Sequence, residues 1–204
     1  MMIALAIIAA YLIGSIPSAY LVTRLRRHED IRKVGTRNMG AMNVFYKVSF
    51  WDGLLVLALD IGKGAAGVAL ARFLGVGEII QYIAGFAVLV GHNFPVFLKF
   101  RGGKGGASCI GILVFFMPWG IPAYLAVFGL LMLITRFPTL SYGAAFLVFF
   151  PIGWFVYKSP SMMIFTACLL LFILIRYLGR VKEMKEKGGS WRRVIKRSSF
   201  KDRF

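Results

Sequence analysis

Six long apolar runs, separated by short charged segments, constrain the fold of this chain more than any other feature. A helix needs about 20 apolar residues to cross the hydrocarbon of a bilayer, and most of the runs approach that length. A mean hydropathy of +0.75 is typical of an integral membrane protein and excludes an ordinary water-soluble domain. The runs are Met2–Val22, Trp51–Leu74, Ile79–Leu98, Ala107–Thr135, Leu140–Val156 and Met162–Leu178.

Two basic segments set the expected orientation, because positively charged loops stay in the cytoplasm. Thr23–Phe50 holds seven Lys/Arg against two acids, and Gly179–Phe204 holds ten against three. Placing both in the cytoplasm with the N-terminus outside requires an odd number of spans. We therefore split Ala107–Thr135 at Pro118–Pro122, although one kinked helix is the alternative. The prediction is an all-α, polytopic membrane protein with seven transmembrane helices, the N-terminus outside and the C-terminus cytoplasmic.

This topology gives a simple domain organisation. We expect residues 1–178 to form a single integral-membrane domain and residues 179–204 to form a basic cytoplasmic tail. The tail suits anionic lipid headgroups and contains no recognisable nucleic-acid module, so membrane lipids and not nucleic acid are the expected partner. Cys109 and Cys168 lie in apolar runs without metal-ligand spacing. No metal and no cofactor are implied.

A basic glycine-rich loop follows the third apolar run. Glycines allow backbone N–H groups to approach a phosphate closely, and a lysine among them supplies positive charge. The spacing differs from that of a Walker A loop. We predict that Lys104 contacts an anion and that Gly102, Gly103, Gly105 and Ser108 help to bind a phosphate.

Ionisable residues within the apolar runs are the second candidate site. Asp60 and Lys63 share one helix face at i, i+3, and His92 lies in the inner half of the next run. Such residues are costly in a membrane and indicate function by default, although a satisfied pair that fixes helix packing is the alternative. Ser15 lies near the inner end of the first run. We expect these four residues, the glycine loop and the polar loop from Gly35 to Asn43 to meet in one cleft at the cytoplasmic face.

The polar segment from residue 31 to residue 43 is the third element. Arg32 and Arg37 can clamp a phosphate in bidentate fashion. Thr36, Asn38 and Asn43 can bind hydroxyl groups or phosphate oxygens. The alternative is an ordinary cytoplasmic turn whose arginines only set topology.

Taken together, these motifs resemble those of the bacterial acyl-phosphate:glycerol-3-phosphate acyltransferases of the PlsY type. The matching residues occur in the family's order and spacing, and the set is specific although no single motif would be. The segments that carry the resemblance are Gly14–Pro17, Asp30–Arg32, Gly35–Val44, Asp60–Gly64, Gly91–Leu98 and Gly102–Ala107.

The resemblance implies a cell (inner) membrane enzyme with its active site at the cytoplasmic face. Such an enzyme moves a fatty acyl group from acyl phosphate to the 1-hydroxyl of glycerol 3-phosphate, giving lysophosphatidate in phospholipid biosynthesis. Because an acyl phosphate is already activated, direct attack needs mainly positioning and charge stabilisation. We expect His92, Asp60 and Lys104 to be catalytic. Either His92 or Asp60 could accept the hydroxyl proton, or the substrate phosphate itself could.

The chain also departs from the family pattern. Arg37 and Met42 replace a glycine and a threonine, Tyr46 replaces an arginine, and Tyr177 and Arg180 replace a histidine and an asparagine. We hypothesise that Arg37 supplies the charge lost at Tyr46 and that Arg180 reaches a phosphate. These departures leave the identity of the acceptor open. The sequence does not determine the acyl-chain preference or the oligomeric state.

Two other functions are compatible with these features. One is a catalytically altered relative that binds anionic lipid or another phosphorylated acceptor. The other is a small phosphate or anion transporter, which would also use glycine-broken helices and intramembrane charges. Against a transporter, the polar motifs cluster toward one face, and the sequence shows no internal repeat.

Overall fold

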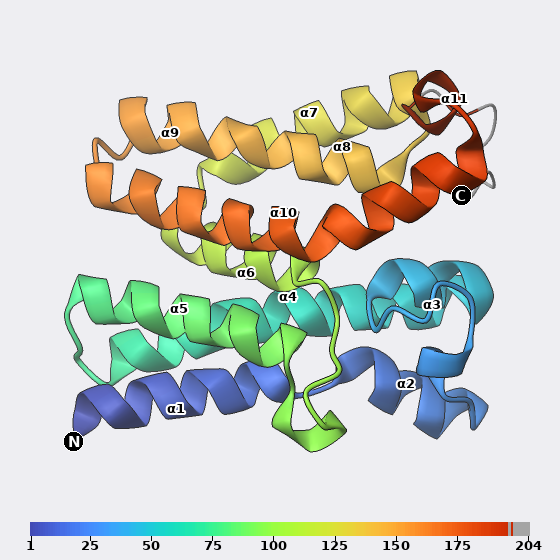
Figure 1. Cartoon of the computed structure of the whole chain (residues 1–204). Coiled ribbons are helices and arrows are strands. Elements are labelled where there is room, and N and C mark those ends of the chain that lie inside the picture. The colour runs from blue at the N-terminus through green and yellow to red at the C-terminus, as the bar shows by residue number, and fades with distance from the viewer. Residues whose placement is uncertain (196, 198–204) are drawn as a thin grey trace. The chain divides into compact units, whose positions relative to one another are not determined.

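The structure, a computed structural model, describes residues 1–195 and 197, and helices dominate it (Figure 1). It divides into two compact units, Met1–Phe116 (unit 1) and Met117–Phe204 (unit 2). The helices of unit 1 are α1 (Met2–Ser15), α2 (Ser18–Arg27), η1 (Ile31–Lys33), α3 (Ala41–Lys47), α4 (Phe50–Phe73), α5 (Glu78–Asn93), η2 (Val96–Leu98) and α6 (Gly106–Phe116). Those of unit 2 are α7 (Gly120–Thr135), α8 (Pro138–Ala145), η3 (Phe146–Val148), α9 (Phe149–Phe155), α10 (Pro160–Gly188) and α11 (Trp191–Ile195).

Within the described residues, five helical segments are long and apolar enough to cross a membrane, which confirms the helical, multi-pass class. The expected break in the fourth run is also present, because α6 ends at Phe116 and α7 begins at Gly120. These two apolar helices are shorter than a full span, so the count of seven spans stays a prediction. The five long segments are Met2–Arg27, Phe50–Phe73, Glu78–Leu98, Pro138–Phe155 and Pro160–Gly188.

Glycines bring α4 and α6 into backbone contact. A Cβ atom at Gly64 would lie 2.2 Å from the carbonyl oxygen of Ser108, and one at Gly111 would lie 1.9 Å from that of Ile61. Neither distance is possible, so both positions must lack a side chain. Small residues at helix interfaces allow this close approach in membrane proteins, where the hydrophobic effect does not drive helices together.

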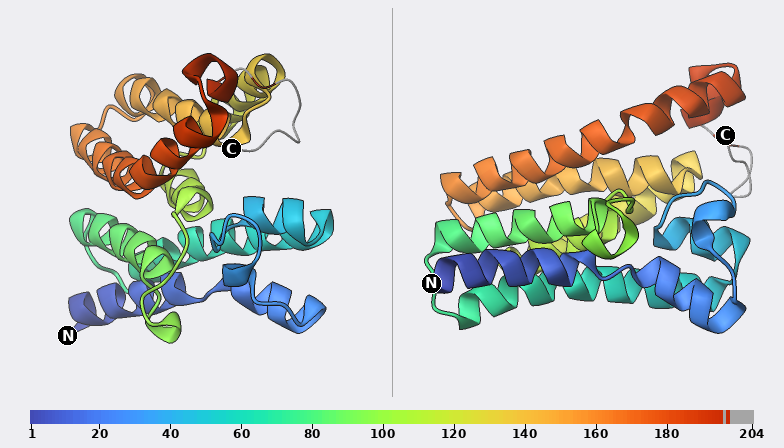
Figure 2. Two further views of the ribbon diagram at one scale, coloured as in Figure 1. Left: turned by 45° about the vertical axis from the view of Figure 1, so that its right-hand side comes forward. Right: turned by 60° about the horizontal axis from the view of Figure 1, so that its bottom comes forward.

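The pair α1 and α5 packs in the same reciprocal way. A Cβ at Gly14 would lie 2.1 Å from the carbonyl oxygen of Val88, and one at Gly91 would lie 2.2 Å from that of Tyr11. Gly91 directly precedes His92, so the backbone contact between α1 and α5 also fixes the position of His92 relative to α1. Figures 1 and 2 show α1, α4 and α5 side by side in unit 1.

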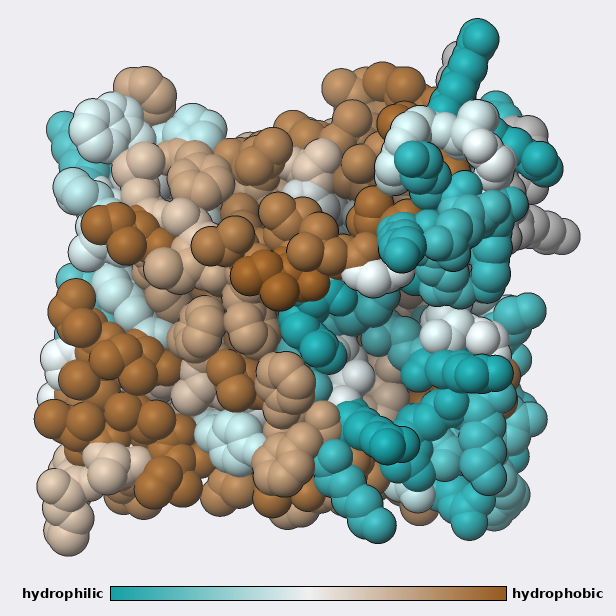
Figure 3. Space-filling view, viewed as in Figure 1, coloured by the Kyte–Doolittle hydropathy of each residue, from teal (hydrophilic) through white to brown (hydrophobic). Residues whose placement is uncertain are grey.

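Polar and apolar surfaces of unit 1 lie at different ends. Figure 3 shows hydrophobic side chains over α1 and α5 and hydrophilic ones over α2 and α3. Large apolar side chains of α1, including Ile3, Ile8 and Leu12, are exposed, as expected for a surface that faces lipid. The charged end of the unit is therefore the end that meets water.

Unit 2 contains the remaining apolar helices and the described part of the C-terminal segment. Phe137, Met184 and Val194 form a small buried cluster, and the Arg197 guanidinium carbon lies 3.7 Å from the centre of the Phe137 ring. Helix α10 continues to Gly188, so the expected boundary at residue 178 falls inside a helix. The tail residues 196 and 198–204 lie outside the described residues.

Gly64→Ala tests the α4–α6 contact. We expect it to lower the free energy of unfolding by about 1–3 kcal/mol, because the added methyl group meets backbone and forces the two helices apart. Gly62→Ala is the matched control, since a Cβ atom there has nothing within 4 Å. Thermal unfolding of the detergent-solubilised variants measures both, and equal stability of the two would contradict the packing argument.

Candidate active site

A small cavity in unit 1 brings together residues from distant parts of the chain. Its volume is about 10 Å³, room for about one water molecule. Five of the predicted site residues line it, and the others lie around it or in the neighbouring loop. The lining residues are Ser15, Ile16, Pro17, Ser18, Met39, Asp60, Lys63, His92, Pro95 and Gly103.

A break between α1 and α2 forms one wall of the cavity. The residue before a proline is driven to extended backbone, and Ile16, which precedes Pro17, has φ −60° and ψ 115°. The break leaves the Ile16 carbonyl available, and the Lys63 ammonium donates a hydrogen bond to it over 2.8 Å. The Ser15 hydroxyl at the same break is fully buried and has no hydrogen-bond partner among the described residues.

The ionisable residues form a buried cluster. Lys63 Nζ lies 2.8 Å from Asp60 Oδ1, and His92 Nδ1 lies 3.6 Å from the same oxygen. All three residues are less than a tenth exposed. Asp60 Oδ1 accepts no hydrogen bond of good geometry within the described part of the chain, so the charge of Lys63 is what stabilises it. The expected i, i+3 pair is therefore present, and His92 joins it from the next helix.

The imidazole of His92 is fixed on both sides. Its Nδ1 lies 3.2 Å from the Ser108 hydroxyl oxygen, which is itself fully buried. Its Nε2 faces Gly103, where a Cβ atom would lie only 2.1 Å away. No sequence pattern indicated a Ser–His pair, because Ser108 and His92 are 16 residues apart on different helices. Since the same nitrogen faces both Ser108 and Asp60, this is not the arrangement of a Ser–His–Asp triad.

Packing against α5 explains the glycines of the basic loop. The Gly103 amide donates to the His92 carbonyl over 3.1 Å, and a Cβ at Gly102 would lie 2.2 Å from that oxygen. Gly105 has φ +87°, and a Cβ there would meet the Leu89 side chain at 2.3 Å. These contacts hold the loop, with half-buried Lys104 in it, against the helix that carries His92.

Asn43 organises the loop that precedes α3. Its side-chain oxygen accepts from the Thr36 amide over 3.0 Å, and its Nδ2 donates to the carbonyls of Val34 and Asn38 over 2.9 and 3.1 Å. The residue is 3% exposed. The amide that we expected to bind substrate thus already holds the loop backbone.

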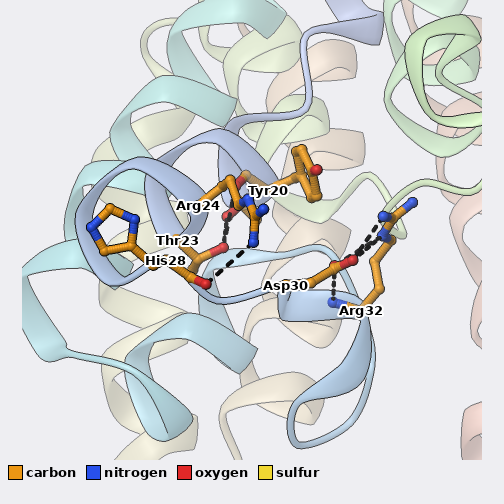
Figure 4. Close-up of polar contacts among 7 residues, drawn as sticks. Tyr20, Thr23, Arg24, His28, Asp30 and Arg32 are labelled. Carbon is orange, nitrogen blue, oxygen red and sulfur yellow. Dashed lines mark hydrogen bonds and ion pairs between the residues drawn. The ribbon is translucent and has the colours of Figure 1, made fainter.

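Arg32 is also engaged within the loop, as Figure 4 shows. Its Nε and Nη2 donate to the two Asp30 carboxylate oxygens over 2.9 and 2.7 Å, and its guanidinium carbon lies 4.9 Å from the centre of the Tyr20 ring. The hydrogen bond from Arg32 holds the pKa of the Asp30 carboxyl below its ordinary value of 3.8. A phosphate clamp by Arg32 would have to share this guanidinium with Asp30.

The rest of the polar loop is more open. Thr36 and Arg37 are exposed and Asn38 is half-buried, and none of these three lines the cavity. Arg37 has φ +59°, a left-handed conformation that is uncommon for a residue other than glycine. Only Met39 of this loop reaches the lining.

Asp52 is a buried charge that the sequence analysis missed. It is fully buried near the start of α4, and its two carboxylate oxygens lie 3.0 and 2.9 Å from Nε of Arg26 and Nε of Arg27. These arginines, which sequence alone assigns to topology, thus also join α2 to α4. No local sequence pattern indicates this contact, because Arg27 and Arg26 are 25 and 26 residues from Asp52.

Two positions where the chain departs from the family pattern lie in unit 2. The Tyr177 and Tyr142 hydroxyls are hydrogen-bonded to each other, and Arg180 Nη1 lies 2.5 Å from Glu183 Oε2. Met42 and Tyr46 are on α3, where Tyr46 is partly exposed. Tyr177 therefore contacts a neighbouring helix, whereas Arg180 pairs with a residue of its own helix.

Comparison with known proteins identifies the class. The profile of the family described as glycerol-3-phosphate acyltransferase matches residues 4–187. A relative from Dehalococcoides mccartyi named glycerol-3-phosphate acyltransferase 2 is 51% identical over 99% of this chain and 97% of its own length. One from Bacillus velezensis, named glycerol-3-phosphate acyltransferase, is 38% identical over 92% of this chain and 96% of its own length.

Solved structures agree with these sequence relationships. The crystal structure of PlsY, an integral membrane glycerol 3-phosphate acyltransferase, in its glycerol 3-phosphate form has a TM-score of 0.82 at 26% identity, covering 91% of this chain and 92% of that one. Its lysophosphatidic acid form has the same coverage and a TM-score of 0.79 at 24% identity, and so supports the fold. Fold and site define a multi-pass membrane acyltransferase. The chain belongs to the glycerol-3-phosphate acyltransferase family, which confirms the resemblance seen in the sequence.

Lys63→Met tests the buried ion pair. Removing one partner leaves the Asp60 charge uncompensated, and we expect a loss of about 3–5 kcal/mol in the free energy of unfolding. The double variant Asp60→Asn/Lys63→Met should recover most of this loss, because neither charge remains. Unfolding followed by tryptophan fluorescence measures both variants. If the double variant is as unstable as the single one, the pair is not what stabilises this region.

The Asp30–Arg32 ion pair predicts that the stability of its loop depends on pH only in the acidic range. Because the folded-state pKa of Asp30 is below 3.8, the pair stabilises the loop above that pH and is lost as the pH falls below it. We expect amide-exchange protection of residues 30–38, corrected for intrinsic rates, to stay constant between about pH 7 and 5 and to fall below about pH 4. In Asp30→Asn the protection should be low throughout, and a wild-type decline beginning near pH 6 would contradict this assignment.

Proposed function

We propose that the chain transfers a fatty acyl group from acyl phosphate to the 1-hydroxyl of glycerol 3-phosphate, as a membrane enzyme of phospholipid biosynthesis. In this reaction the hydroxyl oxygen bonds to the acyl carbon, and the bond from that carbon to the phosphate oxygen breaks. The products are lysophosphatidate and inorganic phosphate, and the hydroxyl proton passes to a base. The observation that carries the proposal is the buried Asp60–Lys63–His92 cluster beside the Lys104 loop, in a chain of this family.

The geometry of His92 suits a proton acceptor held in one orientation. Its Nδ1 faces the Asp60 carboxylate, which favours the proton on that nitrogen. Nε2, on the side of Gly103, is then the ring atom that can accept a proton. Asp60 is the weaker candidate base because the Lys63 ammonium stabilises its charged form. Acceptance of the proton by the substrate phosphate remains the alternative route.

Direct transfer without an acyl-enzyme fits the surroundings of Ser108. Its hydroxyl is fully buried, does not line the cavity, and lies 3.2 Å from His92 Nδ1. The unpartnered Ser15 hydroxyl does line the cavity, and we assign it to substrate binding together with Lys63 and Lys104.

We further propose that the site faces the cytoplasm and that α6 and α7 both cross the membrane, giving seven spans. The basic segment from Thr23 to Phe50 supports this orientation. So does the hydrophilic surface that gathers over α2 and α3 (Figure 3). The acceptor would then enter from the cytoplasm, and the acyl donor from the bilayer.

Acyl transfer by the purified protein in liposomes tests this function. With labelled glycerol 3-phosphate we expect lysophosphatidate from acyl phosphate and none from acyl-CoA. Lys104→Ala should reduce kcat/KM by about 10²–10³, the usual effect of removing one group that stabilises developing charge. In sealed vesicles, product should form only where the face carrying the basic loops contacts the acceptor.

The outcomes of this assay distinguish acyl transfer to glycerol 3-phosphate from the alternative functions. Product from neither donor, with the variant and wild type equally folded, would overturn the proposal and favour a relative that uses another phosphorylated acceptor. Ser108→Ala is the control for the direct route, and we expect it to keep at least a tenth of wild-type kcat. Its complete inactivation with intact folding would indicate an acyl-enzyme.

A further inference from the structure

Unit 2 contains an apolar groove that the proposed reaction does not use. Its volume is about 460 Å³, a size typical of small-molecule sites, and residues of α8, α10 and α11 line it. The two tyrosines among its described lining residues, Tyr142 and Tyr177, are hydrogen-bonded to each other through their hydroxyls. None of the described lining residues is charged. The groove therefore offers contacts to hydrocarbon along its length.

Hydrocarbon has access to this groove. Its lining side chains Leu147, Leu174 and Ile195 are 61%, 57% and 45% exposed. The segments Pro138–Phe155 and Pro160–Gly188, which supply most of its lining, are long and apolar enough to cross a membrane. Their exposed surface meets lipid, and an unfilled groove would forfeit the dispersion contacts of its lining atoms. An acyl chain is the group that a bilayer supplies to fill it.

The groove is about as long as one leaflet is thick. On α10 its lining extends from Leu170 to Met184, which at a rise of about 1.5 Å per residue spans about 21 Å. Half of a bilayer, with its headgroup region, is about 20–22 Å thick. One end of the groove therefore lies at the level of the lipid headgroups when the other lies within the hydrocarbon.

Basic residues identify the headgroup end. Trp191 lines the groove, and Lys185 Nζ lies 5.5 Å from the centre of its ring. Tryptophan and lysine together are typical of the membrane–water interface. The segment from Arg180 to Arg193 carries six basic residues and two acidic ones. Figure 1 shows α11 at the C-terminal end of α10, and Figure 3 shows hydrophobic side chains along α10 giving way to hydrophilic ones at that end.

We propose that the groove binds one acyl chain of an anionic phospholipid of the bilayer, while Lys185 and Arg192 contact its phosphate. Both side chains are exposed, and Arg192 directly follows Trp191. Their charge favours an anionic over a zwitterionic headgroup. A second copy of the chain would bring the same basic residues to this end, where like charges repel. The bound lipid is neither donor nor product of the proposed reaction, so this inference goes beyond that function.

Filling the groove tests where the acyl chain lies. Gly143 lines the groove, and a Cβ atom there has nothing within 4 Å, so Gly143→Leu occupies the groove without meeting backbone. We expect it to weaken binding of dioleoyl phosphatidylglycerol by about tenfold or more, because the acyl chain loses apolar contacts. Native mass spectrometry of the detergent-released protein, titrated with this lipid, measures the Kd. Gly129→Leu on α7 is the matched control, since its Cβ is equally unhindered and Gly129 does not line the groove.

Removing one charge tests the headgroup contact. Wild type should bind dioleoyl phosphatidylglycerol more tightly than dioleoyl phosphatidylcholine, which has the same acyl chains. Lys185→Gln should reduce the affinity for the anionic lipid by about fivefold and leave that for the zwitterionic lipid unchanged. The control is Lys158→Gln, which removes an exposed lysine just before the other end of α10.

Three results would overturn the proposal. Equal affinity of wild type for the two lipids would remove the headgroup contact. Unchanged phosphatidylglycerol binding by folded Gly143→Leu would mean that anionic lipid binds only at the basic surface. A dimer without retained lipid, dissociated by Gly143→Leu and not by Gly129→Leu, would make a second copy of the chain the occupant.

Discussion

The rest of the site depends on one buried ammonium group. Lys63 Nζ lies 2.8 Å from the Asp60 carboxylate and donates to the Ile16 carbonyl over the same distance. It thereby neutralises an acid inside α4 and adds a second hydrogen bond to the Ile16 carbonyl, which also accepts from the Ser18 amide over 3.1 Å. One side chain joins α4 to the α1–α2 break, and it stabilises a buried carboxylate that would be costly alone.

Close helix contacts then determine which groups share the cavity. Gly14 and Gly91 bring α1 and α5 together, and Gly64 and Gly111 do the same for α4 and α6. The first pair sets the position of His92 next to Ser15, and the second brings Ser108 to the imidazole. Small residues therefore do more here than pack helices, because they determine the distances at which polar side chains meet.

Part of the site was predictable from residue order. The topology placed Ser15, Asp60, Lys63, His92 and the glycine loop in one region, and the cavity brings the four side chains and Gly103 together. The polar loop was harder to interpret, because a sequence cannot show that the Asn43 amide is used by the backbone or that Arg32 pairs with Asp30. The type of a polar residue indicates which groups its side chain can bind. Only the folded structure shows which of its hydrogen bonds are already formed within the loop.

The sequence by itself determined the membrane class, the family, and the break in the fourth apolar run, because hydropathy, local motifs and proline act over short stretches of chain. Only the tertiary structure decided that Ser108 meets His92, that Asp52 binds two arginines of α2, and that the glycines of the basic loop pack against α5. Those contacts join residues on different elements. They depend on the depth and rotation of packed helices, which no local pattern of residues specifies.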